Sequence, residues 1–164
     1  MTTANPGADA SPWIALFDEK SPAYHSALQE LRSLFLRVGF IVDKKRDTEA
    51  TLRVYVRERL TYPLLNPIFV SRRRRGSGNR AFVEIQVLSK LTVLSNIHET
   101  LDRRLRKFAA SPLVAFETAG EVRRPYFFHG SFLLPLLLQS GSDSLALDLN
   151  ALEPGLRELL RFLD

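Results

Sequence analysis

Arginine side chains dominate the middle of this 164-residue chain. The segment from Lys44 to Lys107 holds 16 basic and 6 acidic residues, a net charge of +10. The remaining residues, 7 basic and 12 acidic, carry −5, so the whole chain has the formal charge of +5. Twelve of the 16 basic residues are arginines, whose planar guanidinium group suits phosphate better than the point charge of lysine does. The segment therefore predicts an anionic partner that is bound in a salt-dependent way.

Three groups of residues are the candidates for contact with this partner. The first lies on a predicted strand, the second at a predicted hairpin and the strand after it, and the third at the end of a predicted helix. They are Arg53, Tyr55, Arg57 and Arg59; Arg72, Arg73, Arg74, Arg75 and Arg80; and Arg103, Arg104, Arg106 and Lys107. The cations would contact phosphates, which position a protein without reading sequence, and Tyr55 would stack on an exposed base. DNA or RNA fits this pattern best; a membrane surface and an acidic protein surface are alternatives.

A carboxylate and an amide alternate with apolar residues in the Val-Glu-Ile-Gln run at 83–86. In its element order, though in little else, the chain over residues 22–118 resembles the core of the PD-(D/E)xK nucleases, which presents such a strand between helices. The resemblance implies that Glu84 holds a divalent cation such as Mg²⁺, which activates a water for phosphodiester attack. It also implies that Gln86 replaces the family's usual lysine. The chain departs from the family pattern near Asn66, where an aspartate is expected. A metal-dependent nuclease-like domain, active or degenerate, is the enzyme alternative.

Other catalytic and metal-binding patterns are missing from the sequence. The absence of cysteine excludes a thiolate metal site, a cysteine nucleophile and a disulfide scaffold. The histidines His25, His98 and His129 lack ligand spacing, and neither a nucleophile elbow nor a phosphate-binding glycine loop occurs. We therefore predict no cofactor and no metal, unless the nuclease alternative holds. The favoured function is a non-catalytic basic binding or assembly module. In the plainest interpretation, the basic groups are a solvated face and Glu84 pairs with a strand arginine.

The first half of the chain predicts one long helix followed by strands. Tyr24, Leu28, Leu31, Phe35 and Val38 form an apolar stripe at helical spacing over residues 22–38, with Ser21 as N-cap and Gly39 as the stop. A short strand at 40–42 and a polar loop at 43–47 follow. Alternation predicts a half-buried strand at 51–60. Two prolines then predict an irregular stretch at 63–67, before a hairpin of strands at 68–71 and 80–89.

The second half predicts a mixture of helices and strands. Residues 96–109 form a helix with an apolar stripe, and residues 113–118 a strand that ends at an Ala119-Gly120 turn. A strand at 126–128, a short helix at 132–139 and a loop at 140–144 are followed by a terminal helix at 150–163, with Asn150 and Glu153 as its capping box. The predicted fold class is α+β, with a mainly antiparallel central sheet flanked by two helices and a helical, Leu-rich C-terminal part.

The domain organisation follows from these patterns. We predict a flexible lead at 1–12 and a single α+β domain at 13–164, with a basic centre at 44–107 and an apolar part at 120–164. The dense Leu and Phe residues of the apolar part could bind a second copy or a protein partner, which makes a structural subunit of a larger assembly the third functional alternative. We expect a cytoplasmic protein, because the sequence shows neither a secretory signal nor an apolar run of about 20 residues.

Overall fold

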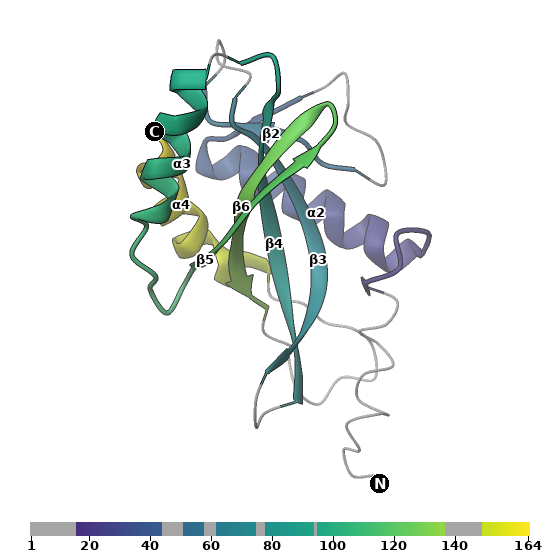
Figure 1. Ribbon diagram of the computed structural model, residues 1–164. Helices are drawn as coiled ribbons and strands as arrows, with labels where there is room; N and C mark the ends of the chain where they lie inside the picture. Colours follow the sequence, from purple (N-terminus) through teal and green to yellow (C-terminus); the bar gives the residue numbers. More distant parts are fainter. Residues whose placement is uncertain (1–15, 44–50, 58–61, 75–77, 94, 137–148) are drawn as a thin grey trace, which may run out of the picture.

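The computed structural model describes residues 16–43, 51–57, 62–74, 78–93, 95–136 and 149–164 (Figure 1). The elements follow in the order α2 (Pro22–Val38), β1 (Ile41–Val42), β2 (Val54–Tyr55), β3 (Leu64–Arg74), β4 (Gly78–Lys90), α3 (Ser95–Arg106), β5 (Ala115–Arg123), β6 (Tyr126–Pro135), the 3-10 helix η1 (Leu149–Leu152) and α4 (Glu153–Leu163). The strands form one antiparallel sheet in the order β1-β2-β3-β4-β6-β5. The predicted α+β fold with an antiparallel sheet and a C-terminal helix is confirmed.

Helix α2 begins and ends where the sequence predicts. The Ser21 hydroxyl accepts a hydrogen bond from the backbone N–H of Tyr24 at 3.1 Å, and Pro22 fits the first turn because no N–H is needed there. At the other end Gly39 has a φ of +123° and donates its N–H to the Phe35 carbonyl, as a left-handed cap does. The predicted apolar stripe, Tyr24, Leu28, Leu31, Phe35 and Val38, is buried.

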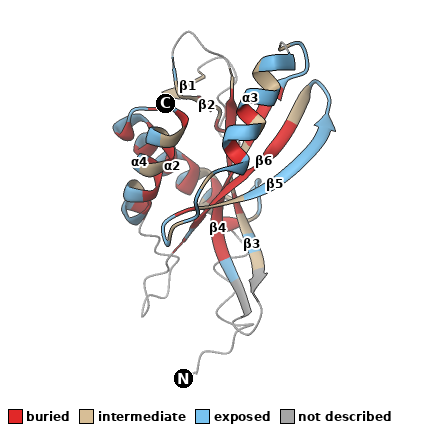
Figure 2. Cartoon of the chain, turned by 60° about the vertical axis from the view of Figure 1, so that its left-hand side comes forward, coloured by how far each residue is buried: buried red, intermediate tan, exposed pale blue. Residues whose placement is uncertain are grey.

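Side chains of the central strand β4 alternate between the two faces of the sheet. Val83, Ile85 and Val87 are fully buried in one core with residues of α2, α3 and α4, which places all three helices on this face. Glu84 and Gln86 lie on the opposite face, where Leu64, Leu88 and Phe128 form a second, smaller apolar cluster. Buried residues follow β4 and β6 for much of their length (Figure 2).

The structure corrects the predictions for residues 51–67. β2 covers only Val54–Tyr55 and pairs with β3 at one position, Val54 with Leu65. β3 begins at Leu64 and continues through Pro67, which the sequence assigned to an irregular stretch. Beyond Leu65 the outer side of β3 has no partner strand among the described residues, so that side of Pro67 needs no N–H donor. Proline is tolerated at such an edge position.

The helix predicted at 132–139 is wrong over its described part, because β6 continues as a strand to Pro135. β6 pairs with β4 on one side and β5 on the other. Phe132 and Leu134 lie in the core beneath the helices, and Leu133 is buried on the opposite face. A strand that is buried on both faces has a continuous apolar run, which periodicity does not distinguish from a buried helix.

Strand β5 extends past the turn that was predicted at Ala119-Gly120. The pairing with β6 shifts register between Thr118 and Glu121, and the chain turns instead at Arg124-Pro125. Gly120 has a φ of +107°. The glycine signal in the sequence therefore marks a bulge inside the strand, where an extra residue is accommodated.

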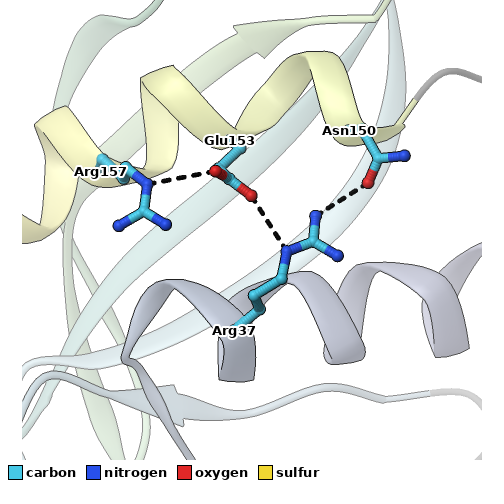
Figure 3. A network of polar contacts seen from close by, with 4 residues as sticks. All are labelled: Arg37, Asn150, Glu153 and Arg157. Carbon is cyan, nitrogen blue, oxygen red and sulfur yellow. Dashed lines mark hydrogen bonds and ion pairs between the residues drawn. The ribbon is translucent and has the colours of Figure 1, made fainter.

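The predicted terminal helix is present as η1 followed by α4, but its predicted capping box is wrong. Leu152 is the N-cap residue and makes no side-chain cap. Asn150 and Glu153 instead accept hydrogen bonds from Arg37 of α2, at 2.8 and 3.0 Å, and Arg157 donates to Glu153 at 3.3 Å (Figure 3). The hydrogen bond from Arg37, supported by that from Arg157, lowers the pKa of the Glu153 carboxyl. These polar residues thus join the first and last helices.

Several predicted features lie outside the described residues: the lead at 1–12, most of the loop at 43–47, the hairpin tip and the loop at 140–144. Within the described part of the chain, no helix has the length and apolar character needed to cross a membrane.

Candidate functional site

A cavity of about 250 Å³ lies between α3, the segment that leads into β3 and the end of α4. Part of its lining is apolar: Val56, Pro63, Ile97, Leu101 and Leu163. The other lining residues carry polar groups, among them the Tyr62 phenol, the Thr100 hydroxyl and two guanidinium groups. Such a mixture of apolar wall and few polar groups is typical of ligand sites.

The two guanidinium groups belong to Arg57 and Arg104, which come from different predicted groups. Arg57 donates from Nε to the Asp164 carboxylate at 2.9 Å and from a terminal nitrogen to the Asp164 backbone oxygen at 3.0 Å. Arg104 donates to the Phe162 carbonyl at 2.5 Å, and its guanidinium carbon lies 5.6 Å from the centroid of the Phe162 ring, within the range of a cation–π contact. The end of α4 therefore holds both arginines at the cavity.

The helix-end group is divided in the structure. Arg103 and Lys107 are exposed, and their side chains make no hydrogen bond or ion pair with other described residues. Arg106 instead forms an ion pair with Asp102 one turn earlier, at 3.0 Å. Arg103 and Arg104 lie in the last turn of α3, and Lys107 is the first residue after the helix, so these three cations are grouped at one end of α3.

The β3–β4 hairpin, whose described side chains include Arg72 and Arg80, extends away from α3 (Figure 1). Arg72 forms ion pairs with Glu84 at 2.5 Å and with Glu117 at 3.1 Å, and the hydrogen bond to Glu84 is the main reason why its pKa is raised. Arg80 is exposed. The side chains of Arg73 and Arg74, and the whole of Arg75, lie outside the described part. The described members of the three predicted groups therefore do not share one site.

The strand group is only partly described. Arg53 is half-buried, Arg57 reaches the cavity, and Arg59 lies outside the described residues. Tyr55 is also half-buried: its hydroxyl donates to an Asp43 carboxylate oxygen at 2.9 Å, and its ring packs on the smaller apolar cluster. The Tyr55 ring therefore packs inside the protein, whereas the sequence predicted it as a platform on which a base stacks.

Glu84 is buried, with only 6% of its surface exposed. Besides Arg72, its carboxylate accepts hydrogen bonds from Gln86 at 3.1 Å and from Ser131 at 3.2 Å. Asn66 on β3 donates to Gln86 at 3.2 Å, so the amide predicted beside the metal site binds another amide. No group of three or more His, Cys, Asp and Glu residues gathers within the described segments. The nuclease alternative stays a prediction without a described ligand cluster.

One arrangement in the structure was not foreseen from the sequence. Ser89 on β4 lies 2.9 Å from Nε2 of His129 on β6, and Nδ1 of His129 lies 3.4 Å from the Asp102 carboxylate on α3. This order of groups matches a serine hydrolase relay. However, Ser89 and His129 are each 1% exposed, and the rings of His98 and Phe127 pack against His129. A substrate has no access to this serine. The three side chains instead join α3 to the sheet. Burial also lowers the pKa of His129.

Comparison with known proteins adds no relative. No protein-family model matches the chain, and no match was found among curated proteins or among solved structures.

Proposed function

We propose that the protein is a non-catalytic basic module that binds nucleic acid through the C-terminal end of α3, which carries Arg103 and Arg104 and is followed directly by Lys107. The observation that carries this proposal is the meeting of Arg57 with Arg104 at one cavity. These residues are far apart in the sequence and belong to two of the three basic groups. Arg57 follows β2 and Arg104 lies on α3, so the cavity links the cationic end of α3 to the segment that follows β2.

The charge balance around α3 supports the same function. Arg103 and Lys107 have no carboxylate partner among the described residues, whereas Arg57, Arg72 and Arg106 are each paired with acidic side chains. Cations without an internal partner are available to displace counterions from a phosphate backbone, which supplies most of the affinity of non-specific binding. The phosphate contacts in this proposal are therefore assigned to Arg103 and Lys107, together with Arg104, whose described partner is a backbone carbonyl and not a carboxylate.

The salt dependence of binding tests the proposal. Affinity for single-stranded and duplex DNA and RNA should fall steeply as salt increases. The variant Arg103→Ala/Lys107→Ala should lower the slope of log affinity against log salt by about 1 to 2, because each phosphate contact contributes about 0.7 to 0.9. A fluorescence anisotropy titration at several salt concentrations measures this slope.

A matched control separates the α3 cations from net charge. Lys20→Ala/Arg124→Ala removes the same number of charges from exposed turns elsewhere in the chain and should leave the slope nearly unchanged. Undetectable binding, salt-independent binding, or equal slopes for the two double variants would overturn the proposal.

A further inference from the structure

The cavity beside α3 combines features that suit the end of a nucleic-acid strand. Its volume of about 250 Å³ is below the roughly 300–1,000 Å³ of most small-molecule pockets, so it accommodates a group smaller than a whole cofactor. Ile97 and Leu101 of α3 supply apolar wall, while Tyr62 supplies an aromatic ring with a hydroxyl. Sugar carbons and a base edge can contact such a wall, and the two arginines are placed to bind an attached anion.

One of these arginines, Arg57, already forms an ion pair with a carboxylate of the protein itself. The Asp164 carboxylate accepts from Nε of Arg57 at 2.9 Å, and Asp164 is itself among the residues that line the cavity. Both partners are more than half exposed, at 57% and 58%. Exposed ion pairs of this kind are weak, so a ligand with more charge can displace the carboxylate from the guanidinium group.

We infer that this cavity receives the terminal phosphomonoester of a nucleotide or of a nucleic-acid strand, and that the Asp164 carboxylate competes with it for Arg57. A terminal phosphomonoester carries a charge of about −1.5 to −2 at neutral pH, whereas an internal phosphodiester carries one negative charge. Two guanidinium groups match the higher charge, and their donor forks match the phosphate oxygens. The part of this inference that concerns strands rests on the proposed function.

The test compares three oligonucleotides of one sequence: with a 5′-phosphate, with a 3′-phosphate, and with neither. One of the phosphorylated strands should bind the wild-type protein about tenfold or more tightly than the unphosphorylated strand, since hydrogen bonds to charged groups are the strong ones. The identity of that strand tells which end of the chain enters the cavity. Arg57→Ala should remove the preference, and Arg57→Lys should restore it only in part because lysine lacks the fork.

Asp164→Asn supplies the second arm of the test. Loss of the competing charge should tighten binding of the phosphorylated strand about two- to fivefold, the range expected for an exposed ion pair, and should leave the unphosphorylated strand unchanged. Lys20→Ala, which removes a charge from an exposed position outside the cavity, should not alter the preference. Circular dichroism establishes that each variant is folded.

The outcomes separate the inference from the proposed function. Equal binding of all three strands by the wild-type protein would overturn the inference and leave the nucleic-acid proposal standing. If no strand binds but adenosine 5′-monophosphate does so in an Arg57-dependent way, measured by calorimetry, the cavity is a mononucleotide site and the proposed function fails. If neither strands nor the mononucleotide bind, both fail. An acidic peptide is the last control, tested as a competitor of the phosphorylated strand. If it displaces that strand as effectively as adenosine 5′-monophosphate does, the assignment of the cavity to phosphate is overturned.

Discussion

At the scale of single residues, the Arg72–Glu84 pair most changes the interpretation of the sequence. Both residues were candidates for function, one as an anion-binding arginine and the other as a metal ligand. In the structure they bind each other, and Glu117, Gln86 and Ser131 complete their hydrogen bonds. A buried carboxylate is costly unless it is paired and hydrogen-bonded, so the network explains how Glu84 is tolerated in the middle of a sheet.

A double-mutant cycle over Arg72→Ala and Glu84→Ala tests this structural role. Residues that share one hydrogen-bond network show coupling free energies of about 0.5–3 kcal/mol, and we expect a value in the upper half of that range because Glu84 is buried. Urea unfolding of the four proteins measures the coupling. The exposed pair of Arg123 with Glu121 is the control, expected below about 1 kcal/mol. Equal coupling in the two cycles would contradict the assigned role.

His129 makes a second prediction at the residue scale, this one about pH. Burial lowers its pKa below the ordinary value of 6.5, against the opposing effect of Asp102, and His98 adds a smaller lowering. The unfolded chain therefore binds the proton more readily than the folded protein as the pH falls through 6.5. The free energy of unfolding should decrease over this window by at most about 1.4 kcal/mol per pH unit. Below the folded pKa the decrease should stop.

Unfolding by urea at a series of pH values from 8 down to about 5 measures this dependence, with the unfolded pKa near 6.5 as its reference. In His129→Gln the amide replaces the ring and does not titrate, so this share of the pH dependence should be absent. The prediction is wrong if the variant retains the full slope of the wild-type protein.

At the scale of elements, α4 contributes to the core through one apolar side. Leu156 is fully buried among residues of that core, whereas Leu36 of α2 is 53% exposed. Leu156→Ala should lower the free energy of unfolding by about 2–5 kcal/mol, as large-to-small core substitutions do. Leu36→Ala removes the same atoms from the surface and should change it by less than about 0.5 kcal/mol. Chemical denaturation of both variants gives the comparison, and similar losses would contradict the packing of α4.

The elements also show how far a sequence can be interpreted. α2 was predictable to the residue because its cap, stripe and glycine stop are local signals. β6 was not, because Phe132, Leu133 and Leu134 are buried on both faces and leave no alternation. The meeting of Ser89, Asp102 and His129, and likewise that of Arg57 with Arg104, depends on strand pairing and helix docking. Such contacts follow from the tertiary fold, on which the local pattern carries no information.

At the scale of the whole molecule, the positive charge is divided between two regions. The β3–β4 hairpin extends away from the helices, and α3 lies at the other end of the sheet (Figure 1). A strand of nucleic acid bound along α3 therefore does not meet Arg72 and Arg80 of the hairpin unless it also follows the length of the sheet. Oligonucleotides that are too short to cover both regions should therefore bind through α3 alone. Footprints measured with oligonucleotides of increasing length would show whether a second contribution enters.

The junction of α2 with α4 has a consequence for the order of events during synthesis. The apolar side of α2 is covered in part by α4, and Arg37 is joined to Glu153 and Asn150 near the other end of the chain. At translation rates of about 5–20 residues per second, more than a hundred further residues take on the order of ten seconds to emerge. During that interval the nascent chain presents Leu28, Leu31 and Phe35 without their final neighbours. Ribosome-bound chains that end before α4 should thus be the form most readily captured by chaperones.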